Sequence, residues 1–585
     1  MHSGGPRVAD YLVSSLVSIG TRHLFGVGGA NIEDLYDAAH HSPEEVRAVV
    51  AKHEFAAACM AEGSQRTTGG LGVVMCTSGA GAMNLVPGVG EAFQARVPML
   101  ALVGQPPRGL EGRGAFQDSS GRAGAPDAVR LFGPISRYCA RVDDPTKVDQ
   151  QLAEAIEAAR GPRGGPSVLL LPKDVQQTRV PGLRPLDELL TAPRVAPAAQ
   201  RDAAAELLAD AVGRRAEIMV IAGDGVSHQE AKDELARLAV LLDAAVAVTP
   251  EGKGVFDNHD PRFLGVTGAI GHPSASDMLH KAEVCVLVGT RLSVMARTGL
   301  DDALAGTRLV ALDAEPPWPE AAEGRPGPIH VAGDLRAELQ ALNESLTRRH
   351  GRRAWEEAPG HGPRHLSLPE PRTPLSGVPL VEAIRAIEEA VPEDATVVSD
   401  AGNASAVAIH YLATPRRGSF IVAMGMGGMG HSFGAGNGAA FATSRRTYVL
   451  SGDGGFYAHG MELHTAVEYG LPVTFVIFDN NAHAMCVTRE QLLYDGTYSY
   501  NTFKPADIAA GAGALFPSLT TVEATTPEHL RDTLLETNPT PGPVLIAVRC
   551  DPDDMPPFTP FLALIDDTTP TRTGASRGDN TSPVG

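Results

Sequence analysis

Residues 447–485 read TYVLSGDGGFYAHGMELHTAVEYGLPVTFVIFDNNAHAM, and this stretch decides the fold class. Two short runs rich in β-branched residues, 447–451 and 473–478, flank a segment with Ala, Leu and Glu at helical spacing. That pattern predicts parallel strands joined by a crossover helix. The first run ends in Gly-Asp-Gly-Gly and the second in Asp-Asn-Asn. Because the carboxyl ends of parallel strands share one ligand-binding edge, we expect Asp453 and Asn480 to lie close together.

A carboxylate together with an amide oxygen is a donor set that suits Mg²⁺, which also takes water and phosphate oxygens. Glycines 452–455 would let backbone amides approach a phosphate at the start of the next helix. Gly-Asp-Gly alone is weak evidence for a phosphate or metal site. The same three residues occur at Gly223-Asp-Gly225 without an Asn partner, and we interpret that occurrence as a turn. The Asn-Asn pair after the next strand makes the motif at 452–455 far more specific.

Alternation of short apolar runs with helical segments extends over most of the chain and predicts three α/β domains with doubly wound parallel sheets. We expect them at residues 1–180, 195–350 and 376–552, with Pro-rich linkers near 176–199 and 351–379 and a mobile tail at 565–585. The expected strands are 72–77, 99–103, 167–171, 217–222, 244–249, 283–288, 308–313, 396–399, 447–451, 473–478 and 544–548.

Composition excludes several classes of protein. The chain has 585 residues, 43% of them apolar and 20% charged, which is ordinary globular usage for a multidomain protein. Its 49 Lys and Arg against 69 Asp and Glu give a net charge of −20, which disfavours nucleic acid and anionic membranes as partners. No secretory signal or spanning segment is evident, and six cysteines without metal-ligand spacing indicate reduced thiols in a cytoplasmic protein.

Residues 452–485 resemble the diphosphate-binding motif of thiamine diphosphate-dependent enzymes. The similarity is to the superfamily of acetolactate synthase, pyruvate oxidase and benzoylformate decarboxylase, and above all to acetolactate synthase large (catalytic) subunits. In that family the Asp and the Asn hold a divalent metal that bridges to the diphosphate. The resemblance therefore implies thiamine diphosphate and Mg²⁺ as cofactors, with Asp453, Asn480 and a carbonyl near Ala482 as metal ligands.

A cofactor of this kind also needs a glutamate, which hydrogen-bonds the pyrimidine ring nitrogen and promotes loss of the C2 proton. Glu54 follows an apolar run and starts an Ala-rich helix, so by itself it is a helix N-terminal acid. The segment from His53 through Ala61-Glu-Gly63 to Asn84 resembles the family's pyrimidine domain. That similarity implies that Glu54 is the activating glutamate, acting across the interface of a homodimer or a dimer of dimers.

Other segments match the family more locally. Gly425-Met-Gly-Gly-Met429-Gly430 resembles GLGTMG, whose Met supports the bent cofactor, although Met429 alone also fits a core methionine. Gly114-Ala-Phe116-Gln117-Asp118 resembles GAFQE, and Gly28-Gly29-Ala30 the PGGA loop, which imply catalytic roles for Phe116 and Gln117. Further cofactor contacts implied by the resemblance are Gly28, Gly29, Thr77, Asn84, Gly402, Asn403, Gly427, Gly452, Gly454, Gly455, His483 and Met485.

The type of reaction is predicted from the absence of histidine in the loop at residues 77–82. Residues 77–82 contain no histidine, as in acetolactate synthases, which favours carbon–carbon ligation over aldehyde release. We expect decarboxylation of a 2-oxo acid, with pyruvate as the leading candidate, and transfer of the acyl carbanion to a second carbonyl compound. The alternatives are a decarboxylase or lyase that releases an aldehyde, and a non-catalytic binding subunit.

Departures from the family pattern indicate a different substrate pocket. The Trp that selects the acceptor in acetolactate synthases is aligned with Arg489, and His431-Ser-Phe433 replaces an FGLP-like segment. We hypothesise that Gln117, His431, His483 and Arg489 shape this pocket and that Arg489 pairs with an anionic group of the acceptor. The alternative for each of the four is a solvated residue or one that lies behind the pocket lining. In the middle region Gly289-Thr-Arg291 is similar to the flavin-binding GxRF, but the residues that follow differ. FAD is left open as a cofactor, and these departures weigh against it.

Overall fold

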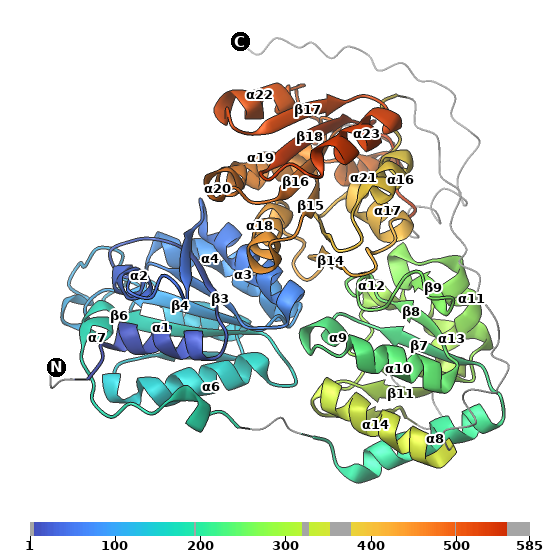
Figure 1. Ribbon diagram of the computed structural model, residues 1–585, viewed down its shortest axis with the longest axis horizontal. Coiled ribbons are helices and arrows are strands. Elements are labelled where there is room, and N and C mark those ends of the chain that lie inside the picture. Colours follow the sequence, from blue (N-terminus) through green and yellow to red (C-terminus); the bar gives the residue numbers. More distant parts are fainter. Residues whose placement is uncertain (1–4, 192–194, 319–326, 351–375, 498, 559–585) are drawn as a thin grey trace.

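The computed structural model describes residues 5–191, 195–318, 327–350, 376–497 and 499–558 (Figure 1), and every structural statement here concerns these residues. They form three six-stranded sheets in which all paired strands are parallel, which confirms the predicted fold class. The three sheets fall within 1–180, 195–350 and 376–552, and the domain limits themselves stay predictions.

The strand order in each sheet identifies the point where ligands bind in such folds. In the first sheet the strands lie in the order β2 (Arg47–Val50), β1 (His23–Val27), β3 (Gly72–Cys76), β4 (Met99–Gln105), β6 (Pro166–Pro172) and β5 (Tyr138–Arg141). In the second sheet the order is β12 (Ile329–Val331), β11 (Arg308–Leu312), β10 (Val284–Val288), β7 (Ile218–Ala222), β8 (Ala245–Val248) and β9 (Phe263–Val266). In the third sheet it is β14 (Ser419–Val422), β13 (Thr396–Ser399), β15 (Thr447–Gly452), β16 (Val473–Asp479), β18 (Val544–Arg549) and β17 (Thr520–Ala524). The chain changes direction between β1 and β3, between β10 and β7, and between β13 and β15. These switch points leave a crevice at the carboxyl ends of the strands.

Helices cover both faces of the sheets (Figure 1). They are α1 (Val8–Ser18), α2 (Glu33–His40), α3 (Glu54–Thr68), α4 (Ala80–Gln94), α5 (Ala128–Phe132), α6 (Val148–Arg160), α7 (Lys173–Gln177), α8 (Ala198–Gly213), α9 (Gly225–His228), α10 (Lys232–Leu242), α11 (Pro273–Lys281), α12 (Val294–Arg297), α13 (Asp301–Gly306), α14 (Leu335–His350), α16 (Leu380–Ala390), α17 (Asn403–Tyr411), α18 (His431–Thr443), α19 (Asp453–His459), α20 (Leu463–Tyr469), α21 (Ala484–Leu493), α22 (Ile508–Leu515) and α23 (Pro527–Thr537). This cover explains why β4, β6 and β16 are buried along their whole length.

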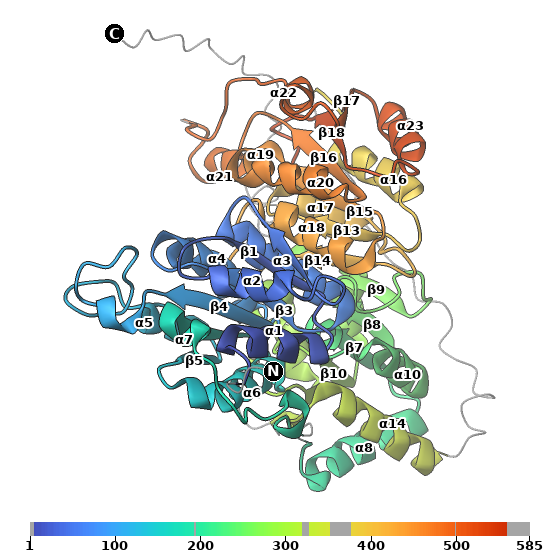
Figure 2. The same ribbon diagram turned by 60° about the vertical axis from the view of Figure 1, so that its left-hand side comes forward.

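Helices α3 and α18 pack closely and join the first and third sheets (Figures 1 and 2). The contact needs glycine, because a Cβ on Gly63 would lie 2.0 Å from the carbonyl oxygen of Ala435. A Cβ on Gly438 would lie 2.0 Å from the carbonyl oxygen of Met60. The backbone contact fixes α3, which begins at Glu54, against α18, which begins just after Met429.

The strands expected from the sequence are present within one or two residues, but the inner strand β1 and most edge strands were not predicted. β5, β9, β12, β14 and β17 each form the edge of a sheet and are only three to five residues long. The first linker was predicted too early: Val180 and Leu186 are buried in the core of the first domain, and α8 begins at Ala198. Most of the second linker and the predicted tail lie outside the described residues. No helix of the described chain is long and apolar enough to cross a membrane.

Candidate active site

A cavity of about 230 Å³ lies at the carboxyl ends of β13, β15 and β16. Asp453, the first residue of α19, and Asn480, which directly follows β16, both line it, as the strand order led us to expect. The other lining residues are Leu380, Ala401, Gly402, Asn403, Ala404, Met429, Gly452, Gly454, Gly455, Phe478, Ala482, His483, Ala484, Met485 and Cys486. Most residues that the sequence placed around a diphosphate therefore surround one cavity.

The Asp453 carboxylate is buried but only half satisfied. Its Oδ1 accepts a hydrogen bond of 2.7 Å from the Gly454 amide, whereas Oδ2 is buried without a hydrogen-bond partner among the described residues. Burial and the neighbouring charge of Asp479 raise the pKa of Asp453 to about 7. A buried carboxylate with a free oxygen is costly unless a cation neutralises it.

The remaining donors at this position fit an oxygen-liganded divalent cation. Asn480 lines the same cavity as Asp453, and its Oδ1 accepts a hydrogen bond of 3.1 Å from the Ala482 amide. In the described chain no group of three His, Cys, Asp or Glu side chains could hold a metal. A cation here would thus use Asp453 together with amide, carbonyl, water or phosphate oxygens, which is the ligand set that Mg²⁺ prefers.

The glycines around Asp453 serve two different needs. A Cβ on Gly455 would lie 2.1 Å from Asp400 Oδ2, and one on Gly454 would lie 2.5 Å from His483 Cδ2, so close packing excludes larger residues. At Gly402 and Gly452 a Cβ would meet nothing within 4 Å. These two positions leave backbone exposed to a ligand, and Gly402 has φ +127°, a conformation that favours glycine.

The loop that carries Met429 is held at both ends. The Glu91 carboxylate accepts hydrogen bonds from the amides of Gly425 (2.9 Å) and Met426 (2.5 Å). At the other end Asp400 Oδ2 accepts from the Gly430 amide at 2.8 Å. Between these anchors Met429 lines the cavity and keeps 42% of its surface exposed, so it is not a core methionine within this chain.

A second group of predicted residues gathers at the carboxyl ends of β1, β2 and β3 in the first domain. Glu54 is buried, and its Oε2 accepts a hydrogen bond of 3.0 Å from Asn84 Nδ2. Thr77 Oγ1 donates to Gln117 Oε1 at 3.2 Å, and a Cβ on Gly29 would lie 2.7 Å from Thr77 Cβ. We call Glu54, Thr77, Asn84, Gln117 and Gly29 the glutamate cluster.

The glutamate cluster and the 230 Å³ cavity are separate within one chain. None of the cluster's residues lines that cavity, whose described lining comes entirely from the third domain. Phe116, beside Gln117, keeps 78% of its surface exposed, and Met426 keeps 60%. Gly28 and Gly427 meet nothing within 4 Å where a Cβ would be. Both halves of the predicted site therefore present open surfaces.

The hypothesis of one pocket shaped by Gln117, His431, His483 and Arg489 is wrong for His431. His431 is 1% exposed and its Nε2 lies 3.0 Å from Glu62 Oε2 in α3, so it cannot contact a substrate. Only His483 of the four lines the cavity, and Arg489 lies on the exposed side of α21. Within the chain, the four residues do not come together.

Sequence reasoning missed the buried charges that hold the site together. Glu62 accepts from His431 and, at 2.8 Å, from Arg66 Nε. Burial alone would raise the pKa of Glu62, but His431 and Arg66 outweigh it and lower that pKa to about 2. For His431 burial would lower the pKa, yet Glu62 reverses the direction and raises it. No local pattern predicts the contact between Glu62 and His431, which are 369 residues apart. The charge of Asp479 near the site was predictable, because Asp479 directly precedes Asn480.

Comparisons with known proteins assign the three domains to one family. The N-terminal TPP binding domain of thiamine pyrophosphate enzymes matches residues 6–123, the central domain of these enzymes 202–342, and their C-terminal TPP binding domain 400–548. The chain belongs to the thiamine pyrophosphate enzymes.

Within that family it is similar to acetolactate synthase large subunits over most of its length. It is 31% identical to the acetolactate synthase large subunit of Parasynechococcus marenigrum over 84% of this chain and 79% of the relative. It is 29% identical to the probable acetolactate synthase large subunit of Methanocaldococcus jannaschii over 94% of this chain and 93% of the relative. The protein is therefore an acetolactate synthase-like thiamine diphosphate enzyme.

Proposed function

We propose that the chain is a decarboxylating carboligase that binds thiamine diphosphate and Mg²⁺ and takes a 2-oxo acid, pyruvate first, as donor. The observation that carries this proposal is the cavity on which Asp453 and Asn480 meet with one carboxylate oxygen left unpartnered. Asp453, Asn480 and the carbonyl of Ala482 would hold the metal. The open backbone at Gly402 and Gly452 would face the diphosphate.

The glutamate cluster supports the second half of the proposal. Bound thiamine diphosphate supplies the electron sink for decarboxylation of a 2-oxo acid. Glu54 would hold the proton shared with the pyrimidine ring nitrogen, and the Asn84 amide orients its carboxylate from 3.0 Å away. Met429 would support the bent cofactor from the anchored loop, while Gln117 and Phe116 would contact the substrate side.

Because the two halves do not share a cavity within one chain, we place the complete site between two subunits. Phe116 beside Gln117 and Met426 in the loop of Met429 are largely exposed in the single chain, so a second subunit could cover both. The assembly would be a homodimer or a dimer of dimers. We place it in the cytoplasm and expect it to act without a bound flavin.

Carboligation is favoured over aldehyde release because residues 77–82 offer no histidine to protonate the product of decarboxylation. The acceptor would be a second carbonyl compound, with His483 at the cavity and the exposed Arg489 nearby on α21. Arg489 would pair with an anionic group of that acceptor.

The test is incubation of the purified protein with thiamine diphosphate, Mg²⁺ and a panel of 2-oxo acids, with and without aldehyde acceptors. CO₂ release with a carbon–carbon ligated product is expected, and pyruvate should be the best donor. Free aldehyde as the main product would overturn the carboligase assignment in favour of a decarboxylase. No CO₂ from any 2-oxo acid would indicate a non-catalytic subunit.

A further inference from the structure

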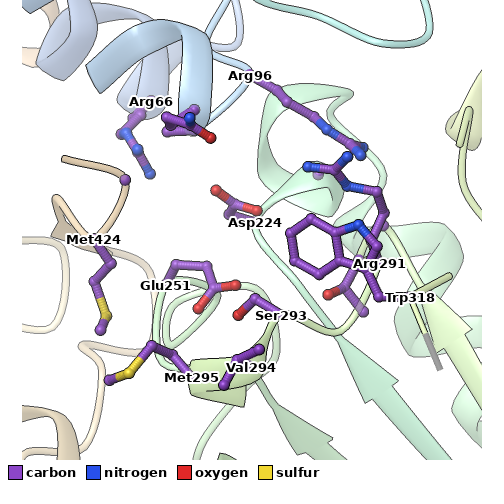
Figure 3. A pocket seen from close by; sticks show the side chains of 16 residues that line it. Arg66, Arg96, Asp224, Glu251, Arg291, Ser293, Val294, Met295, Trp318 and Met424 are labelled. Atoms are coloured by element: carbon purple, nitrogen blue, oxygen red, sulfur yellow. The ribbon is translucent and has the colours of Figure 1, made fainter. Parts of the chain in front are cut away.

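A second cavity, of about 360 Å³, lies where the three domains meet (Figure 3). Most of its central-domain lining follows β7 and β10, at the switch point of that sheet, where ligands bind in such folds; Glu251 follows β8 and Trp318 follows β11. Arg66 at the end of α3, Arg96 after α4, and Met424 with Gly425 complete the lining from the other two domains.

One side of this cavity is acidic. The turn Gly223-Asp-Gly225 after β7 is tight, because a Cβ on Gly225 would lie 2.7 Å from the carbonyl oxygen of Gly289. This turn places the Asp224 carboxyl group in the cavity near that of Glu251 (Figure 3). Burial and the charge of Asp224 raise the pKa of Glu251 to about 7, so the two carboxyl groups together carry at least one negative charge.

Another side holds a single guanidinium with a spare donor. Arg66 is 8% exposed, and its Nε donates to Glu62, but its Nη2 is buried without a hydrogen-bond partner among the described residues. Figure 3 shows the Arg66 guanidinium pointing into the cavity toward Asp224. A buried unpaired donor is costly, so a ligand that supplies an acceptor would be favoured here.

The other two arginines on the lining are already neutralised. Arg96 donates to Asp313 at 2.8 Å and to Glu315 at 2.7 Å. Arg291 Nη1 lies 2.9 Å from Glu315, and its guanidinium stacks 4.2 Å from the centroid of the Trp318 ring. Two arginines thus face two carboxylates, and neither is free to bind an anion.

Apolar side chains form a third part of the wall. Trp318 keeps 47% of its surface exposed, Met295 38% and Val294 65%, and all three line the cavity. Figure 3 shows Trp318 at the right of the cavity and Met295 and Val294 at its bottom, while Arg66 lies at the upper left. The cavity therefore offers an unpartnered charged donor on Arg66 for an acceptor group, two carboxyl groups for a cation, and an apolar surface.

We propose that this cavity binds a small zwitterion of the α-amino acid class. The ligand carboxylate would pair with Arg66, its ammonium with Asp224 and Glu251, and its side chain would lie against Trp318 and Met295. A dinucleotide fits this chemistry badly, because its diphosphate would meet the carboxyl groups of Asp224 and Glu251 on the cavity wall.

Isothermal titration of the purified full-length protein tests the proposal, with glycine, L-valine, L-glutamate, L-arginine and L-tryptophan added singly. At least one should bind. Its N-acetyl derivative and its carboxamide should each bind about tenfold more weakly or worse, because each loses a charged hydrogen-bond partner. The same loss is expected for the double variant Asp224→Asn, Glu251→Gln, and not for the control Asp233→Asn on the exposed side of α10.

Four outcomes would overturn the proposal: no binding of any of these amino acids, equal binding of the two derivatives, unchanged binding by the double variant, or tighter binding of ADP or FAD than of every amino acid. Thermal melting of each variant, compared with the unchanged protein, separates loss of the site from loss of the fold. None of these readouts depends on catalytic activity.

Discussion

The close contact between α3 and α18 makes Gly438→Ala the most informative stability variant. Its Cβ would lie 2.0 Å from the Met60 carbonyl oxygen, so the helices would have to separate by more than 1 Å to reach ordinary contact near 3.4 Å. Overpacking costs about 1–3 kcal/mol, while Ala gains roughly 1 kcal/mol over Gly in a helix. Because the overlap involves rigid backbone on both sides, we expect a net loss of about 2 kcal/mol.

For a domain of roughly 150–250 residues, a loss of about 2 kcal/mol in the free energy of unfolding corresponds to a fall of roughly 4–8 °C in melting temperature. Differential scanning fluorimetry measures such a shift. The control is Gly511→Ala in α22, where a Cβ meets nothing within 4 Å and should be neutral or stabilising. If Gly438→Ala melts like Gly511→Ala and keeps full turnover, then the α3–α18 contact does not position the two half-sites.

The remaining predictions concern the pH dependence, the metal and the acceptor. The Glu62 carboxylate contributes stability that is fully present above its unfolded pKa near 4.5 and is lost as the pH falls toward its folded pKa of about 2. The His431 imidazole contributes stability that is fully present below its unfolded pKa near 6.5 and is lost as the pH rises through its raised folded pKa. The melting temperature of His431→Gln should therefore fall furthest below that of the unchanged protein between pH 4.5 and 6.5; a constant difference at all pH values would contradict the charged pair. Asp453→Asn should weaken Mg²⁺-dependent binding of thiamine diphosphate by about tenfold or more in a fluorescence titration, since even partners outside the metal shell are worth that much; unchanged Mg²⁺ dependence would argue against the ligand assignment. Arg489→Ala should raise KM for the acceptor without altering cofactor affinity, and unchanged KM values and products would exclude Arg489 from the pocket.

Most inner strands were predictable from the sequence, whereas the inner strand β1 and the edge strands were not. β4, β6 and β16 are buried on both faces and so read as continuous apolar runs. β5 and β17 lie at sheet edges, are partly exposed and carry charged residues, which removes that signal. The fold class was therefore predictable, although several strands of each sheet were not.

The same contrast holds for the site. Asp453 and Asn480 could be predicted to meet because one strand–helix–strand unit carries both, and the rules of parallel sheets place their ends together. Glu62 and His431 meet only because α3 of one domain packs on α18 of another. Tertiary contacts of this kind leave no pattern in the local sequence, and for that reason His431 was assigned to a pocket that it does not reach.

The central claim is that Glu54 of one subunit and Asp453 of its partner complete one active site. Co-expression of Glu54→Gln with Asp453→Asn, under two different affinity tags, tests it most directly. Each variant alone should be inactive in 2-oxo acid decarboxylation. In mixed dimers one of the two sites would combine an unchanged Glu54 with an unchanged Asp453, so a statistical mixture should recover roughly a quarter of full activity. Mixed dimers as inactive as the separate variants, or a fully active Glu54→Gln protein, would contradict the account.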